Sequence, residues 1–599
     1  MILQALVGYY DRQRALPETT MPPYGWVRRP IDYIFELDSE GNCTNVLTIA
    51  SFEKGKRIGM PSLVPAIGKQ ALKHTNSGKD ANLLWDGTAF ALGWQDDKGS
   101  RLPSFVAAID EWFSDVEDSG LRAVRAFVRN LQARPGLAEE TIRRFRLNED
   151  FAKHEPVIAF QLAGDEVGPV HFREAVRRAF EARLVRPDDQ SPRGNCLLSG
   201  ATDAELADNE TVIKGVKNSQ TSGANLVSFN SASFVSYGKG GRGGECAPIS
   251  KRASFAYTTA LNHLLDYDSR NRVQVGDAST VFWADRESRF DGEFTLADLF
   301  GENKDNPDRG AKAVGALFDA LKTGRLPVGE RDVRFFVLGL APNAARISVR
   351  FWLHAPFAEL APRILQHFAD LSVVRQRESD PIAPSIFALL RAIAPQGNVE
   401  RFPDRLAGEW IRSVLEGSPY PPALAHAAVA RFKVAFRDEK KWDPSYLIAA
   451  VLKAWLNRDH RKTHPDLPPD HQHFKEELDL DQTDTPYRLG RLFAVLERIQ
   501  SRAMPGINAT IRDRYYSAAS TTPVAVFTTL LRLKNAHQKK LVEREQGYFE
   551  KLIGEVLEPM ADFPRQLTLP QQARFALGYY HQRQHFFTRK DNDNPAQEN

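Results

Sequence analysis

The chain has 599 residues, 42% of them apolar and 10% aromatic, so it can bury several hydrophobic cores. Its formal net charge of +3 excludes a histone-like or strongly acidic protein and confines any nucleic-acid surface to a local patch. The three cysteines, Cys43, Cys196 and Cys246, form no CxxC pair, which favours a reducing cytoplasmic location. No apolar block approaches the roughly 20 residues of a membrane span, so no export and no membrane partner are expected.

Residues 1–356 are predicted to form a mixed α+β domain. Alternating apolar residues on either side of a turn at 38–42 predict a hairpin. From about 104 to 184 the apolar spacing becomes helical, and a strand at 226–237 is expected to precede a helix at 254–265. A second hairpin is predicted over 333–353, with Ile347, Val349 and Phe351 on one face of its second strand.

Helical signals dominate the rest of the chain. Residues 357–480 are expected to be a helical connecting region that ends in a Pro/His/Asp-rich linker. Residues 481–599 carry several apolar stripes at helical spacing, and Thr568 with Gln571 forms a capping box before the last of them. The predicted fold class is therefore α+β, with a C-terminal helical bundle.

Catalytic signatures are sparse, because no GxSxG, GxxxxGK[ST] or HExxH motif occurs. Two hypotheses of an enzymatic function remain open.

Gly238, Gly240 and Gly243 match the dinucleotide pattern GxGxxG, although Pro248 separates them from the next helix. The dipeptide Asp459-His460 is compatible with a metal-dependent phosphohydrolase. A cluster of metal-capable side chains follows it, but three prolines and irregular spacing favour a solvated linker; these side chains are His464, Asp466, Asp470, His471 and His473. No cofactor, no metal and no catalytic residue are expected.

Residues 211–255 hold six cations against the single anion Glu245, an excess larger than that of the whole chain. The cations are Lys214, Lys217, Lys239, Arg242, Lys251 and Arg252. Amide and hydroxyl side chains lie among them, including Asn218, Gln220, Ser222 and Asn225. Cations neutralise phosphate and amides read base edges, so the segment is predicted to bind nucleic acid; a flexible basic surface loop is the alternative. Asn225 could instead cap a turn.

The predicted bundle is also cationic, with 17 Lys and Arg against 13 Asp and Glu in residues 481–599. Its arginines gather early, at Arg488, Arg491, Arg498, Arg502, Arg512 and Arg514. Spacings of seven and four place Arg491, Arg498 and Arg502 on one helix flank, where they can form a positive ridge. A merely solvated helix face is the alternative interpretation.

Several sequence blocks resemble the large subunit of the type I-C CRISPR interference complex, Cascade. They are SGANLVSFNSASFVSYGKG (222–240), ASFAYTTALN (253–262), VGDASTVFWAD (275–285), VLGLAPNAARISVRFW (337–352), PYRLGRLFAVLERIQ (486–500) and FALGYYHQRQHFF (575–587). The blocks occur in order over most of the chain. The glycine-dense GKGGRGGE and Lys251-Arg252 depart from the family pattern.

The resemblance implies a non-catalytic subunit of an assembly in which guide pairing reads the target and protein reads a flanking motif, the PAM. Implied partners are the crRNA, target double-stranded DNA, Cas5-type and Cas7-type backbone subunits, a small subunit resembling the C-terminal bundle, and a nuclease-helicase recruited afterwards. We expect the cations and amides of 211–255 to contact the PAM duplex, helped by a polar loop with Asn76, Lys79 and Asn82. Arg491, Arg498 and Arg502 are the candidates for holding the displaced strand.

Overall fold

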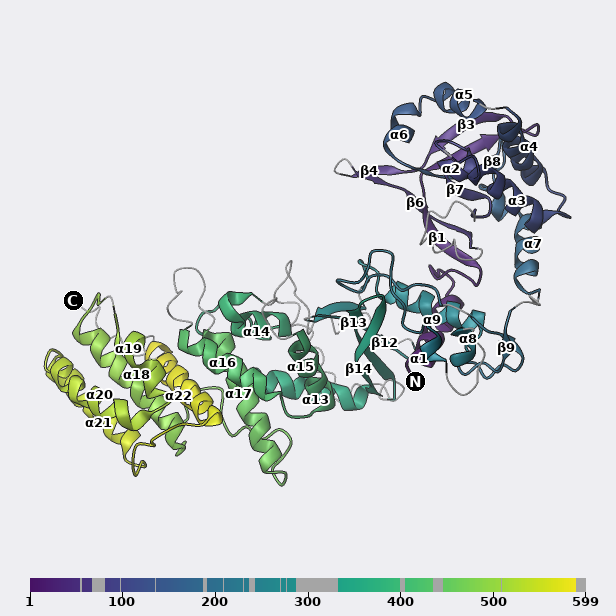
Figure 1. The fold of residues 1–599 in the computed structure, drawn as a ribbon. Helices are drawn as coiled ribbons and strands as arrows, with labels where there is room; N and C mark the ends of the chain where they lie inside the picture. The colour runs from purple at the N-terminus through teal and green to yellow at the C-terminus, as the bar shows by residue number, and fades with distance from the viewer. Residues whose placement is uncertain are drawn as a thin grey trace. The chain divides into compact units, whose positions relative to one another are not determined.

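The computed structural model describes residues 1–599 except 54–55, 67–80, 97, 135, 187–190, 208–209, 230, 236–242, 270, 276, 287–331, 399–403, 435–444, 508 and 589–599. The chain forms two compact units. The first comprises Met1–Lys214 and Gln220–His263, and the second comprises Gly215–Ser219 and Leu264–Asn599. The fold class is mixed α+β, as predicted (Figure 1).

The first unit is built on a four-stranded sheet in the order β3–β2–β8–β7. Its strands are β2 (Tyr33–Leu37), β3 (Cys43–Thr48), β7 (Trp85–Gly87) and β8 (Val157–Leu162). Strands β2 and β8 pair in parallel, whereas the other two pairs are antiparallel. Helices α3 (Arg101–Phe113) and α4 (Ser119–Ala133) supply Phe105 and Phe127 to a core shared with Phe35 and Phe160 of the sheet.

The predicted hairpin at 33–49 is confirmed as β2 and β3. Asp38 closes the turn by accepting hydrogen bonds from the N–H groups of Glu40 and Asn42, and Gly41 adopts a φ of 82° that side chains disfavour. The prediction of helices over 104–184 is confirmed at α3 and α4, but it is wrong at 157–162, where the chain forms strand β8. This strand is central, and its apolar run is too short for periodicity to separate strand from helix.

Smaller elements complete the first unit. They are α1 (Ile2–Ala15), β1 (Trp26–Ile31), β4 (Ser51–Glu53), β5 (Lys56–Ile58), β6 (Met60–Pro65), α2 (Thr88–Ala91), α5 (Leu137–Arg144), α6 (Asn148–Lys153), α7 (Glu174–Leu184), β9 (Arg193–Gly194), β10 (Ala204–Glu205), α8 (Gly243–Cys246) and α9 (Lys251–Leu264). Strand β1 pairs with β6, β4 with β5 and β9 with β10. The expected helix at 254–265 is confirmed as α9.

The second unit begins with an antiparallel sheet of β11 (Arg272–Val275), β12 (Ala278–Ala284), β13 (Arg334–Asn343) and β14 (Arg346–Pro356). The predicted hairpin is confirmed as β13–β14. The prediction that Ile347, Val349 and Phe351 share one face of its second strand is wrong. The register shifts at Gly339/Leu340, which leaves Arg350 of β14 as an extra residue. Because of this extra residue, Phe351 lies on the opposite face of the strand from Ile347 and Val349. Ile347 and Phe351 are both buried, whereas Val349 is 39% exposed.

Helices follow the sheet without a further strand in the described part of the chain. They are α13 (Phe357–Leu371), α14 (Ile386–Ile393), α15 (Asp404–Glu416), α16 (Pro422–Val434), α17 (Ser445–Thr463), α18 (Thr485–Ala503), α19 (Ile511–Ala519), α20 (Pro523–Gln538), α21 (Glu543–Leu557) and α22 (Leu569–Thr588). The side chain of Gln571 accepts the N–H of Thr568 at 2.8 Å, as the predicted capping box requires.

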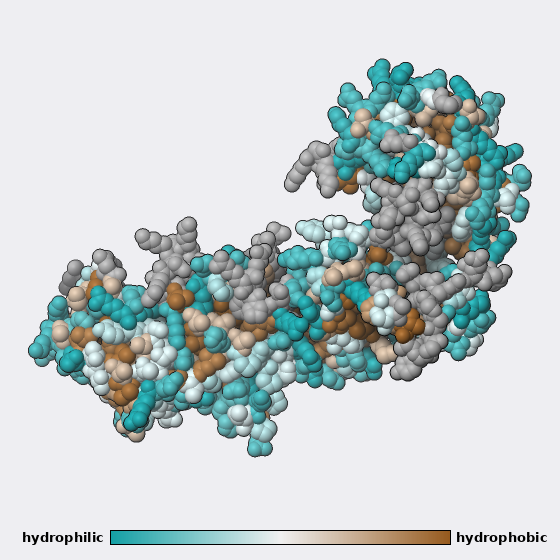
Figure 2. Space-filling view, in the orientation of Figure 1, coloured by the Kyte–Doolittle hydropathy of each residue, from teal (hydrophilic) through white to brown (hydrophobic). Residues whose placement is uncertain are grey.

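One hydrophobic cluster runs through the second unit, from Val273 of β11 to Tyr580 of α22. Figure 2 shows hydrophobic patches on the face of the helical part of the second unit, bordered by polar residues. The β11–β14 sheet therefore belongs to the same compact unit as helices α13–α22. The expected boundaries at 356 and 480 stay predictions about functional domains.

Candidate nucleic-acid interface

Backbone hydrogen bonds anchor the segment that the sequence predicts to contact DNA. In the first unit, Ile213 and Ala224 exchange two N–H···O bonds of 2.9 Å, which closes the loop between them. In the second unit, the N–H of Lys217 donates to Ser279 Oγ of β12 at 2.9 Å. Each part of the loop is therefore attached by backbone hydrogen bonds within its own unit.

The polar side chains of this loop face solvent. Lys214, Lys217, Asn218, Gln220 and Ser222 are all exposed. Within the part of the chain that the structure describes, no side-chain hydrogen bond or ion pair occupies Lys217, Asn218, Gln220 or Ser222. Asn218 has a φ of 61°, a left-handed conformation that asparagine tolerates better than most residues. We name Lys217, Asn218, Gln220 and Ser222 the polar quartet.

Asn225 has a structural role, which the sequence left open. Its Nδ2 donates to the backbone oxygen of Glu210 at 3.4 Å. The Glu210 carboxylate is 7% exposed and accepts the N–H groups of Leu226 and Val227 and the hydroxyl of Tyr257. Burial raises the pKa of Glu210 to about 7, although these donors oppose the shift. Glu210 thus fastens the loop to α9.

Lys251 and Arg252 begin α9 and line an open cleft of about 500 Å³ in the first unit. The Lys251 ammonium lies 3.2 Å from the Glu205 carboxylate and donates to Ser191 Oγ at 2.7 Å. Arg252 is exposed and lies over the ring of Tyr24, 5.3 Å from its centroid. Lys251 is therefore engaged within the protein, whereas Arg252 presents its charge to the cleft.

The second predicted polar loop, with Asn76, Lys79 and Asn82, gives no exposed contact residue among those that the structure describes. Asn76 and Lys79 lie outside the described residues, as do Lys239 and Arg242 of the main segment. Asn82 is fully buried, and its N–H donates to Asp86 Oδ2 at 2.8 Å. The predicted surface role of Asn82 is wrong, because the chain turns inward at Leu83 and Trp85 to join the sheet.

The glycine motif lacks the surroundings of a dinucleotide site. Gly238 and Gly240 lie outside the described residues, and Gly243 opens the four-residue helix α8. The expected strand at 226–237 is wrong, since its described residues form bends and a short 3-10 turn. A Rossmann loop joins a strand directly to a long helix, and the described residues provide no such strand.

Arg491 does not belong to an exposed ridge. Its side chain is 2% exposed and its Nε donates to Gln582 Oε1 at 3.2 Å, because α22 covers that flank of α18. Burial also lowers its pKa. Arg488 and Arg512 are buried as well. The sequence missed this because charged residues on a helix are assigned to its outer face unless a neighbouring helix is known.

Arg498 and Arg502 remain accessible. Arg498 is half-buried and lies 5.9 Å from the ring centroid of Phe586 and 5.6 Å from that of Phe587. Phe587 is itself 49% exposed. Arg502 is exposed and forms an ion pair with Glu545 of α21. A cation beside an exposed aromatic ring is the combination that single-stranded nucleic acid uses for stacking.

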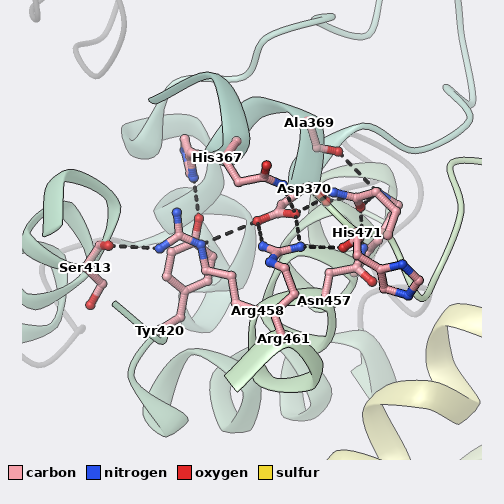
Figure 3. A network of polar contacts seen from close by, with 12 residues as sticks. His367, Ala369, Asp370, Ser413, Tyr420, Asn457, Arg458, Arg461 and His471 are labelled. Carbon is pink, nitrogen blue, oxygen red and sulfur yellow. Dashed lines mark hydrogen bonds and ion pairs between the residues drawn. The ribbon is translucent and has the colours of Figure 1, made fainter. Parts of the chain in front are cut away.

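A buried polar network in the helical half was not predicted (Figure 3). Asp370 of α13 is completely buried and accepts from Arg461 at 2.5 Å, from Arg458 at 3.4 Å and from Gln472 at 2.7 Å. Lys453 donates to the Asp370 backbone, and burial lowers its pKa to about 8. The polar residues of α17 recur at helical spacing within an apolar helix, a signal that could have indicated a polar seam.

The predicted linker is partly packed and brings histidines together. His460, at the end of α17, meets His471 and His473, with ligand atoms within 4.8 Å of one another. Burial and the neighbouring histidine rings lower the pKa of His460 to about 4. Among the described residues this is the one group of three histidine, cysteine or acidic side chains whose candidate ligand atoms lie this close together, and it includes neither Asp459 nor the exposed Asp466 and Asp470.

A family model described as CRISPR-associated protein (Cas_Csd1) matches residues 6–587. The chain belongs to the Csd1 family. This match over nearly the whole chain confirms the resemblance to the type I-C Cascade large subunit, and it makes the protein a CRISPR-associated Cascade subunit. No curated protein matches the chain.

The blocks that carry the resemblance pack together in this Csd1 protein. VGDASTVFWAD and VLGLAPNAARISVRFW form β12–β14, whereas PYRLGRLFAVLERIQ and FALGYYHQRQHFF form α18 and α22. Helices α18 and α22 lie against each other, as Figure 1 also shows. None of the helices in the described part of the chain is both long and apolar enough to cross a lipid bilayer.

Proposed function

We propose that this Csd1 family member is a non-catalytic subunit that recognises the PAM, promotes strand opening and stabilises the R-loop. The observation that carries the proposal is the polar quartet, whose side chains face solvent and make no hydrogen bond or ion pair with any residue that the structure describes. The loop backbone is hydrogen-bonded at Ile213 and Ala224 in the first unit and at Lys217 in the second. A fixed backbone with unengaged donors and acceptors lowers the entropy lost on binding. In guide-directed complexes only a short motif must be read by protein, so a small contact set is sufficient.

The chemistry of the quartet suits a minor groove. That groove offers mainly acceptors, with one donor on guanine, and the amides of Asn218 and Gln220 can satisfy both kinds of group. Lys217 supplies charge for a nearby phosphate. Lys214 and Arg252 are exposed and add cations from the first unit, whereas Asn225 and Lys251 act within the protein.

Opened DNA exposes unpaired bases as well as phosphates, and a subunit that stabilises it needs stacking surface beside positive charge. Arg498 with Phe586 and Phe587 provides that combination on the C-terminal helices. We therefore expect the displaced DNA strand to bind at Arg498, Phe586 and Phe587. Arg502 is a further cation for its phosphates. The crRNA, the Cas5-type and Cas7-type subunits, the small subunit and the nuclease-helicase are the proposed partners.

The decisive experiment compares PAM-containing with PAM-free duplex in the assembled complex. Asn218→Ala with Gln220→Ala should lower affinity for the PAM duplex by about 10–100-fold, which corresponds to one or two lost base contacts. Affinity for the PAM-free duplex should change little. Asn535→Ala, an exposed amide on α20, is the matched control.

Equal losses on both duplexes would reduce the quartet to a non-specific surface and contradict PAM reading. Assembly with guide RNA, measured by co-purification, should be unchanged in both variants. Cleavage of matched DNA by the isolated chain would contradict the non-catalytic assignment. The same assay with added nucleotide or divalent metal tests the dinucleotide and phosphohydrolase alternatives.

A further inference from the structure

Three histidines converge between the end of α17 and the segment that leads to α18. His460 contributes from the last turn of the helix, and His471 and His473 contribute from the following segment. The His460 and His473 rings stack with centroids 3.9 Å apart, and those of His460 and His471 lie 5.9 Å apart. Every pair of candidate nitrogen ligands lies within 4.8 Å. Two nitrogens on one tetrahedral ion lie about 3.3 Å apart, so the rings must rotate out of their stack to direct all three nitrogens at one ion.

The buried network around Asp370 positions the backbone of this segment. Gln472, between the two histidines, donates to Asp370 at 2.7 Å and accepts from Lys453 at 3.1 Å and from Asn457. Its side chain is thus turned to the network, while the rings of the flanking histidines lie beside that of His460.

Hydrogen bonds also hold both ends of the segment. Arg461 donates to the backbone oxygen of His471 at 2.9 Å. Asn457 pairs with the backbone of Phe474 through bonds of 2.8 and 3.0 Å. Metal affinity depends on such outer contacts, because ligands that are already placed need not be ordered on binding.

We propose that His460, His471 and His473 bind one divalent transition-metal ion of the Zn²⁺ class. Imidazole nitrogen suits Zn²⁺, Co²⁺, Ni²⁺ and Cu²⁺, whereas Mg²⁺ and Ca²⁺ require oxygen ligands that this trio lacks. Three protein ligands leave one coordination position for water or for His464, whose ring stacks on that of His460 at 4.1 Å. The ion ties the end of α17 to the segment before α18 and stabilises that junction by binding only the folded chain.

The test uses the full chain with any histidine tag removed, freed of metal with EDTA and titrated with Zn²⁺ against a chromophoric chelator. We expect about one equivalent per chain in the wild type. His471→Ala or His473→Ala should each lower affinity by more than the roughly 10–100-fold that loss of an outer partner costs. His426→Ala, an exposed histidine on α16, is the matched control and should bind as the wild type does.

A spectroscopic test needs no variant. Co²⁺ added to the metal-free wild type should give the intense visible absorption of a four-coordinate or five-coordinate nitrogen site, and one equivalent of Zn²⁺ should abolish it. An octahedral, weakly absorbing spectrum would overturn the proposal. So would unchanged affinity in His473→Ala, loss of affinity in His426→Ala, or stoichiometric binding only near millimolar Zn²⁺.

Discussion

Gly490 of α18 and Gly578 of α22 mark a crossing at which the two helix backbones touch. A Cβ on Gly490 would lie 2.0 Å from the backbone oxygen of Phe575, and one on Gly578 would lie 2.0 Å from that of Tyr487. Both glycines lie within blocks that carry the family resemblance. Their absence of side chains allows the two helix backbones to approach each other this closely.

Gly578→Ala should destabilise the second unit by about 1–3 kcal/mol or more, because the obstructing atoms are backbone and cannot rotate away. Gly554→Ala in α21 is the matched control, since a Cβ there meets nothing within 4 Å. The control should be neutral or stabilising by roughly 0.5–1 kcal/mol through helix propensity. Chemical denaturation followed by circular dichroism measures both, and equal midpoints would contradict the tight crossing.

Asp370→Asn should be strongly destabilising, by roughly 3–5 kcal/mol, because Arg458 and Arg461 would remain buried without their carboxylate. Glu416→Gln breaks an exposed pair with Arg412 and should cost less than about 1 kcal/mol. Thermal unfolding of both variants distinguishes the two cases. A small effect of Asp370→Asn would contradict a buried network that depends on the charge of this carboxylate.

The raised pKa of Glu210 predicts that the free energy of unfolding of the first unit depends on pH. Its folded pKa of about 7 exceeds the ordinary value of 4.5, so the folded state binds an extra proton between these values. The stabilisation by this proton is fully present below about pH 4.5 and is lost as the pH rises through about 7. Between pH 5 and 8 the loss is on the order of 2 kcal/mol.

Glu210→Gln keeps an acceptor for Leu226 and Val227 but cannot ionise. Its amide NH2 replaces the oxygen that accepts from the Tyr257 hydroxyl, so in the variant the amide donates to Tyr257 instead. Relative to the wild type it should therefore gain stability as the pH rises from 5 to 8. Urea denaturation at several pH values checks this, with the exposed Glu117→Gln as control. Parallel pH profiles for Glu210→Gln and the wild type would contradict a titrating Glu210.

Arg498→Glu combined with Arg502→Glu should shorten R-loop lifetime and reduce its dependence on salt, with guide assembly intact. Phe587→Ala should also shorten it, through lost stacking worth about 1–3 kcal/mol per base. Arg377→Glu, an exposed charge reversal elsewhere in the second unit, serves as control. If the lifetime is unchanged in all variants, Arg498 and Arg502 are solvated surface.

Local signals in the sequence were sufficient for the α+β class, both hairpins, α9 and the C-terminal helices. Each depends on turn chemistry, capping or periodicity within about 20 residues, as at Asp38 and Thr568. The family blocks were equally readable, because they are strings of residues rather than contacts.

Only the tertiary structure decided which polar residues are available for binding. Asn82, Arg491 and Asp370 are polar in sequence but buried, and the partners of Arg491 and Asp370 come from helices distant in the chain. Conversely, His460 and His473 lie in a stretch expected to be solvated, and the Asp370 network draws them together. Periodicity records the preference of one element, whereas burial and convergence depend on its neighbours, and these are set by packing over the whole unit.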